Sequence, residues 1–150
     1  MSMQVGISFD LDRGDYAVLM KRLRSMTLVE QGNMFAAALR TVASPFVRAV
    51  KRQTPVGPTG NLKRSISHDI KKYRGGQLVY AYIGPSWWNR GRHGHLVEYG
   101  TKRRTNKRGQ NRGIMPMNPF LTPTFLANKS GLETALAASV AANVEKIWGK

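Results

Sequence analysis

The most extended amphipathic pattern lies in the first third of the sequence. Its apolar residues recur at intervals of three and four positions, which is the spacing of one face of an α-helix. They are Phe35, Leu39, Val42, Phe46 and Val50. We therefore predict a long helix from Thr27 or Leu28 to Arg52. Pro45 lies inside it and lacks a backbone N–H, so we expect a kink near Thr41.

A second long helical pattern occupies the end of the chain. Its large apolar residues follow one another every four positions, with alanines between them. They are Leu132, Leu136, Val140, Val144 and Trp148. Thr122 is placed to cap this helix and Pro123 to occupy its first turn, where proline is tolerated. Because small residues let helices approach closely, we expect this apolar stripe to be a main stabiliser of the fold.

The N-terminal segment combines a strand pattern with a cluster of acids. Gln4–Phe9 alternates between polar and apolar side chains, which predicts a short strand. Asp10, Asp12 and Asp15 precede a helical pattern, and acids in a first turn favour the positive end of the helix dipole. A calcium-binding loop is the alternative, but the glycine and the distal glutamate of such a loop are missing. We therefore predict helix capping.

Two strand patterns in the middle of the chain predict a hairpin. They span Ser67–Lys72 and Gln77–Gly84, and the segment between them contains Gly75-Gly76, a turn signal. The second strand is apolar on both faces, so we expect one face to be covered by a helix and the other by a second helix or a neighbouring subunit. The predicted fold class is α+β, a single domain (1–150) in which a small antiparallel sheet packs against two long helices. A basic loop and a proline-rich connector, Met115–Pro123, lead to the last helix.

The helical and strand-rich halves meet at an elbow, Thr54–Ile66, which reads T-P-V-G-P-T-G-N-L-K-R-S-I. Its prolines prevent continuation of the preceding helix, and its glycines enter turn conformations without strain. Thr59 is placed to cap a short helix with Leu62 and Ile66 on one face. A phosphate-binding loop does not fit, because the lysine that must follow the second glycine is displaced. The residues of the predicted elbow are Pro55, Gly57, Pro58, Thr59, Gly60 and Leu62.

Charge is distributed unevenly along the chain. The sequence has 150 residues, no cysteine and a formal net charge of +16. Residues 51–113 carry fifteen basic against two acidic side chains, a net charge of +13. Such clustering indicates a polyanionic partner, either DNA or the acidic surface of a complementary ring. Without cysteine there is no disulfide framework. Since no apolar run is long enough for a bilayer and no secretion signal is visible, we expect a soluble cytoplasmic product.

The most basic segment is residues 102–113. It has no acid and no large apolar side chain, so it cannot bury itself and should be a mobile loop in the free subunit. Its cations are Lys102, Arg103, Arg104, Lys107, Arg108 and Arg112. Two interpretations are a solvated loop and an arm that is ordered by DNA phosphates or by an acidic neighbour. Binding through phosphates would be sequence-independent and steeply dependent on salt.

Two candidate sites precede this segment. Trp87 and Trp88 are adjacent in a loop, where neighbouring residues rarely both point inward, so we expect one to be exposed, either at a protein interface or stacked on a base, and we favour the interface. His93, His95 and Glu98 suggest a metal or acid–base site, but a fourth ligand, a nucleophile and a second carboxylate are missing nearby. We therefore predict no catalytic residue, no metal and no cofactor. Glu98 should form an ion pair with an arginine, within the subunit or across subunits.

Four motifs follow one another along the chain. P-T-G-N-L-K-R-S-I lies in the elbow, H-L-V-E-Y-G-T spans His95–Thr101, P-M-N-P-F-L-T-P-T-F spans Pro116–Phe125, and the alanine-rich helix closes the set. This ordered set resembles the tail-completion family of long-tailed phages, whose members are neck, or head–tail joining, proteins. In that resemblance Glu98–Thr101 is a packing signature. The chain departs from the family at Pro58, where an acid often stands, and in its long basic loop.

The resemblance implies a structural virion protein that is not an enzyme. It would form a homo-oligomeric ring, expected to be a hexamer, in the neck of a virion assembled in the host cytoplasm. Its partners would be the head connector and tail proteins, with DNA in the lumen and no membrane. The residues expected at the oligomer interface are Trp87, Trp88, Glu98 and Tyr99. The alternative is a monomeric, sequence-independent nucleic-acid-binding protein.

Overall fold

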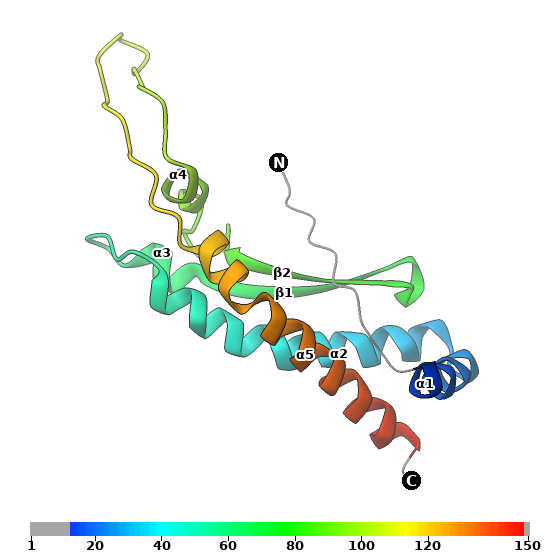
Figure 1. Cartoon of the computed structure of the whole chain (residues 1–150). Helices are drawn as coiled ribbons and strands as arrows, with labels where there is room; N and C mark the ends of the chain where they lie inside the picture. The colour runs from blue at the N-terminus through cyan, green and yellow to red at the C-terminus, as the bar shows by residue number, and fades with distance from the viewer. Residues whose placement is uncertain (1–12, 149–150) are drawn as a thin grey trace. The chain divides into compact units, whose positions relative to one another are not determined.

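The computed structural model describes residues 13–148 and shows five helices and a two-stranded sheet in that part of the chain (Figure 1). The elements in order are α1 (Arg13–Ser25), α2 (Leu28–Gln53), α3 (Asn61–Ser65), β1 (Ile66–Tyr73), β2 (Leu78–Pro85), α4 (Gly94–Tyr99) and α5 (Leu121–Trp148). The α+β class, the two long helices and the antiparallel hairpin are as predicted. The predicted strand Gln4–Phe9 and the acids Asp10 and Asp12 lie outside the described residues.

The chain divides into two compact units, and α2, α5 and both strands contribute residues to each. Within the described residues, the first unit comprises residues 13–43, 70–82 and 129–148. The second comprises residues 44–69 and 83–128.

A reciprocal cap at Thr27 determines where α2 begins. The hydroxyl of Thr27 accepts the backbone N–H of Glu30 at 3.3 Å, and Glu30 Oε2 accepts the N–H of Thr27 at 2.8 Å. This capping box satisfies two amides that a helix end leaves unpaired. The hydrogen bond from the Thr27 backbone holds the pKa of Glu30 below its ordinary value. The helix continues through Pro45 to Gln53, and the expected kink stays a prediction.

In the first unit, α2 packs against α5. The buried side chains of this core are Met34, Ala38, Leu136, Val140 and Val144, and the half-buried ones around it are Leu23, Met26, Phe35, Leu39 and Val42. The predicted stripe of α5 is thus confirmed at three positions, and Leu132 is half-buried. At about 1.5–3 kcal/mol for each large apolar side chain fully removed from water, this seam is a main source of stability.

The hairpin of the first unit rests on α2 through a contact between two glycines. A Cβ on Gly76 would lie 2.3 Å from the carbonyl oxygen of Leu28, and one on Gly32 would lie 2.7 Å from the Cα of Gly76. Gly76 also has a φ of 107°, which glycine adopts without strain. Lys72 adds a hydrogen bond of 2.7 Å from Nζ to Asn33 Oδ1. Only small residues at these positions let the hairpin turn approach the helix so closely.

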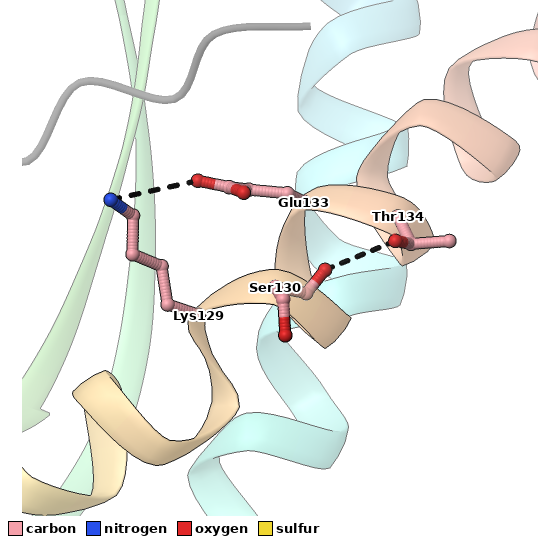
Figure 2. Close-up of polar contacts among 4 residues, drawn as sticks. All are labelled: Lys129, Ser130, Glu133 and Thr134. Carbon is pink, nitrogen blue, oxygen red and sulfur yellow. Dashed lines mark hydrogen bonds and ion pairs between the residues drawn. The ribbon is translucent and has the colours of Figure 1, made fainter. Parts of the chain in front are cut away.

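Farther along α5, still in the first unit, the exposed side of the helix carries local polar contacts. Lys129 Nζ lies 3.9 Å from Glu133 Oε1, and the hydroxyl of Thr134 donates to the carbonyl oxygen of Ser130 at 3.1 Å (Figure 2). Gly131 lies between them, and a Cβ built there meets nothing within 4 Å. The helix therefore passes through a glycine that no contact requires.

In the second unit, the predicted elbow ends in a short helix. Leu62 and Ile66 are buried as expected. The cap differs by one residue: Gly60, with a φ of 61°, occupies the N-cap position of α3, and the Thr59 hydroxyl accepts the Asn61 N–H at 3.4 Å. Glycine takes the cap because this position is left-handed, a conformation that costs threonine strain.

Candidate assembly and nucleic-acid interface

The buried carboxylate of Glu98 joins α4 to the first turn of α5 within the second unit. Its Oε2 accepts the backbone N–H groups of Phe120 and Leu121 at 2.8 and 3.0 Å, and its Oε1 accepts that of Thr122 at 2.8 Å. Amides in the first turn of a helix lack partners within the helix, and negative charge is favourable there. Burial raises the pKa of Glu98, but the hydrogen bonds from the Leu121, Phe120 and Thr122 amides outweigh it and hold the pKa below its ordinary value.

This arrangement differs from what the sequence predicted for Thr122 and for Glu98. Thr122 was expected to cap α5, whereas the helix begins at Leu121 and Glu98 supplies the cap from a distant position in the chain. In the part of the chain that the structure describes, backbone amides rather than an arginine bind the Glu98 carboxylate. Glu98 is 5% exposed, which leaves little of it for another subunit, while its neighbour Tyr99 is 67% exposed.

Gly100 follows α4 directly and lies against the connector that precedes α5. Its φ is 69°, and a Cβ there would lie 2.8 Å from the Met117 nitrogen and 2.9 Å from the Met115 oxygen. The Thr101 N–H donates to the Met115 carbonyl at 2.9 Å, and the Met115 N–H donates to the Thr101 hydroxyl at 3.0 Å. The Asn118 N–H reaches the Val97 carbonyl at 2.8 Å. The second and third sequence motifs are thus bonded to each other.

The basic segment, residues 102–113, is called the basic arm below; its two legs are joined by backbone hydrogen bonds and by one isolated bridge. The Arg104 N–H donates to the Gly113 carbonyl at 3.1 Å, and the Arg112 N–H donates to the Arg104 carbonyl at 2.7 Å. Thr105 and Asn111 form an antiparallel bridge. Figure 1 shows the arm projecting from the second unit beyond α4. Its six cations are all exposed.

A network around Asn106 closes the tip of the basic arm. Asn106 Oδ1 accepts the N–H groups of Arg108 and Gln110 at 3.0 and 2.9 Å, and its Nδ2 donates to Gln110 Oε1 at 2.7 Å. Gly109, with a φ of 74°, completes the turn. Composition predicted that this segment is mobile in the free subunit, which stays a prediction; composition does not record the turn chemistry seen here. The sequence did contain a signal for this turn, because Asn106 stands three residues before Gly109.

The tryptophan loop of the second unit presents aromatic surface. Trp87 is 59% and Trp88 91% exposed, so both rather than one are accessible in this chain. The Arg92 guanidinium lies 4.8 Å from the centre of the Trp87 ring, within the range of a cation–π interaction. The loop is held tightly at Gly91, where a Cβ would lie 2.4 Å from the hydroxyl oxygen of Ser65. A fixed loop therefore carries the exposed rings.

A second aromatic surface lies on the hairpin of the first unit. Tyr80 and Tyr82 are 44% and 53% exposed, and Leu78, on the same face of β2, is 39% exposed. The Tyr80 ring also contacts the Tyr73 ring, with centroids 5.6 Å apart. The opposite face of β2 is half-buried, whereas no second helix of this chain covers the face of Leu78, Tyr80 and Tyr82 among the described residues, and its cover by a neighbouring subunit stays a prediction.

The histidines of the candidate metal site are separate and accessible. His93 and His95 are exposed, whereas Glu98 is engaged with α5. Among residues 13–148, no three histidine, cysteine, aspartate or glutamate side chains come together in a group that could hold a metal ion. Within the same residues, none of the helices combines the length and the apolar character that a membrane crossing requires.

A family model described as "Bacteriophage HK97-gp10, putative tail-component" matches residues 17–100, more than half of the chain. The chain belongs to this HK97-gp10-like family of phage tail components. The predicted family is thereby confirmed. No curated protein and no solved structure matches the chain.

The HK97-gp10-like match places the candidate residues in two groups. It covers the elbow, the hairpin, the tryptophan loop and α4, and it ends at Gly100. The basic arm, the connector and α5 follow the matched region. Membership in this family therefore makes the chain a structural component of a phage virion. Because the matched region ends before the basic arm, only the arm's own residues indicate what it does.

Proposed function

We propose that the chain is a tail-completion, or head–tail joining, subunit that forms a homo-oligomeric ring in the neck of a tailed phage. The ring would contain six copies, by the resemblance of its ordered motifs to that family, and would link the tail to the head connector while DNA passes through. It would be built in the host cytoplasm before it enters the virion. The role is structural and needs no catalytic residue.

The observation that carries this proposal is that each compact unit exposes its own set of aromatic side chains. Trp87 and Trp88 belong to the second unit, while Tyr80 and Tyr82 belong to the first. In a closed ring, every subunit contacts its two neighbours through two different surfaces. Exposed tryptophan and tyrosine are enriched at the centre of such contacts. Two separate aromatic surfaces are what a ring subunit requires.

The second candidate function is that of a monomeric, sequence-independent nucleic-acid-binding protein. The net charge of +13 in residues 51–113 favours it. For duplex DNA it does not account for the exposed tryptophans, because a duplex offers no unstacked base for the ring to cover, whereas a single strand does. A measurement of subunit number separates the two functions, since only the first requires a ring.

The proposed function is tested by producing phage particles without this chain. We expect filled heads and complete tails that remain separate, and we expect the purified chain to join them when it is added. A Trp88→Ala variant should join them less efficiently, because it lacks the most exposed ring, whereas Lys146→Ala should act like the wild type. Infectious particles formed without the chain would contradict the proposal.

A further inference from the structure

We propose that the basic arm binds duplex DNA through its phosphates, without reading the base sequence. The inference rests on the proposed function only for its setting, a passage through which DNA moves. The features that support the binding are the shape of the arm, its side chains and the hydrogen bonds that its side-chain amides already make.

The shape of the arm suits a groove of DNA. Its two legs are held side by side, like a narrow ribbon, by the backbone hydrogen bonds of Arg104 to Arg112 and Gly113 and by the isolated bridge between Thr105 and Asn111. The major groove of B-form DNA, about 12 Å wide, admits a two-stranded β-ribbon. A ribbon that lies in or along this groove places cations from both of its strands beside phosphates.

The side chains of the arm favour DNA over an acidic protein surface. Residues 102–113 contain six cations, no acid and no large apolar side chain. Interfaces between proteins draw their energy from a few buried anchors, chiefly aromatic and arginine side chains packed in apolar pockets. Interfaces with DNA are more polar and much more positive. The exposed apolar residues nearby, Tyr99, Ile114 and Met117, lie outside the arm.

The amide side chains of the arm are already occupied. Asparagine and glutamine read adenine by two hydrogen bonds from one side-chain amide. Asn106 and Gln110 bond to each other and to the backbone of the tip, and Asn111 Oδ1 accepts the Gly113 N–H at 2.9 Å. The groups left to bind a ligand are the six cations; arginine and lysine can bind guanine as well as phosphates, but in the proposed contact all six bind phosphates. The arm should therefore bind different sequences with equal affinity.

The experiment measures the affinity of the full chain for a random-sequence duplex of about 30 base pairs as salt is raised from about 50 to 200 mM. If all six cations neutralise phosphates, the log–log slope approaches about −5, and affinity falls roughly a thousandfold over this range. Changing Lys107, Arg108 and Arg112 to Gln should make the slope shallower by about 2–3, because each lost phosphate contact removes ~0.9.

A matched control removes the same charge away from the arm. Lys21, Arg24 and Lys146 are exposed on α1 and α5, and their change to Gln lowers the net charge equally. We expect this variant to keep the wild-type slope, and circular dichroism should show both variants folded. Equal weakening of DNA binding by the two variants would show that net charge alone matters and would overturn the proposal.

Further outcomes also decide the question. A tenfold preference between an A·T-rich and a G·C-rich duplex would reveal base readout and overturn the proposal, as would wild-type protein that fails to bind duplex at the lowest salt. Poly-L-glutamate that competes as well as DNA of equal charge would assign the arm to an acidic protein instead. Ring formation is measured on the same samples with and without tail and connector proteins, so a chain that binds DNA through its arm but stays monomeric in both cases contradicts the proposed function and supports this inference.

Discussion

The carboxylate of Glu98 provides the sharpest test of how the second unit is held together. Changing Glu98 to Gln removes the negative charge and leaves one carbonyl oxygen for the backbone amides of Phe120, Leu121 and Thr122. A hydrogen bond to a charged group contributes about 1.5–3 kcal/mol, and an unsatisfied buried donor costs about 1–3 kcal/mol. Since part of the network survives in Gln, we expect a loss of about 2–4 kcal/mol in the free energy of unfolding.

The pH dependence of this loss identifies its cause. The pKa of Glu98 is lowered in the folded chain, so the folded state favours the charged form. Its stabilising effect is therefore complete above the unfolded pKa and disappears as pH falls through the lower, folded pKa. The wild type should lose its advantage over Glu98→Gln between about pH 5 and the acid limit. Glu30 also has a lowered pKa, but it is present in both proteins and cancels in the difference.

The assay is urea unfolding of both proteins at one fixed concentration, at about pH 7 and again at about pH 4. Glu133→Gln is the control, because that side chain is 30% exposed, against 5% for Glu98, and its pair with Lys129 at 3.9 Å is open to solvent and should contribute little. A Glu98→Gln variant as stable as the Glu133→Gln control at neutral pH would refute the capping role. So would a difference from the wild type that does not shrink in acid.

Two further predictions concern α5 in the first unit. Leu136→Asp places an unpaired charge in the seam with Met34 and Ala38 and should lower the free energy of unfolding by about 3–5 kcal/mol. Ala135→Asp changes an exposed position and should lower it far less. Equal melting temperatures for these two variants would contradict the packing. Gly131→Ala should stabilise the chain by about 0.5–1 kcal/mol in urea unfolding, because a Cβ there meets nothing within 4 Å, and a loss of stability would show that the glycine is needed.

The sequence was sufficient for elements whose signal is local. The apolar spacing from Phe35 to Val50 located α2 to within one residue at its end, and Gly75-Gly76 located the hairpin turn. What it could not supply were contacts between distant segments. The bonds from Glu98 to the start of α5 join residues more than twenty positions apart, and no local pattern records them.

The candidate surfaces also include some features that the sequence predicted and others that it could not. Two adjacent tryptophans predicted aromatic exposure, because neighbouring residues in a loop cannot both turn inward, and Trp87 and Trp88 are both exposed. The exposure of Tyr80 and Tyr82 was hidden, because an apolar face looks the same in sequence whether the chain or a partner covers it. The expected interface role of Glu98 rested on charge alone, and charge did not reveal the amides that bind it.

The measurement that tests the central claim most directly is the number of chains in the assembled protein. Native mass spectrometry of the purified chain, with and without tail and connector proteins, counts the copies in each complex. The account predicts a closed ring, six copies by the family resemblance, that weakens when Trp88 is changed to Ala. A chain that remains monomeric both alone and in the presence of these partners would contradict it.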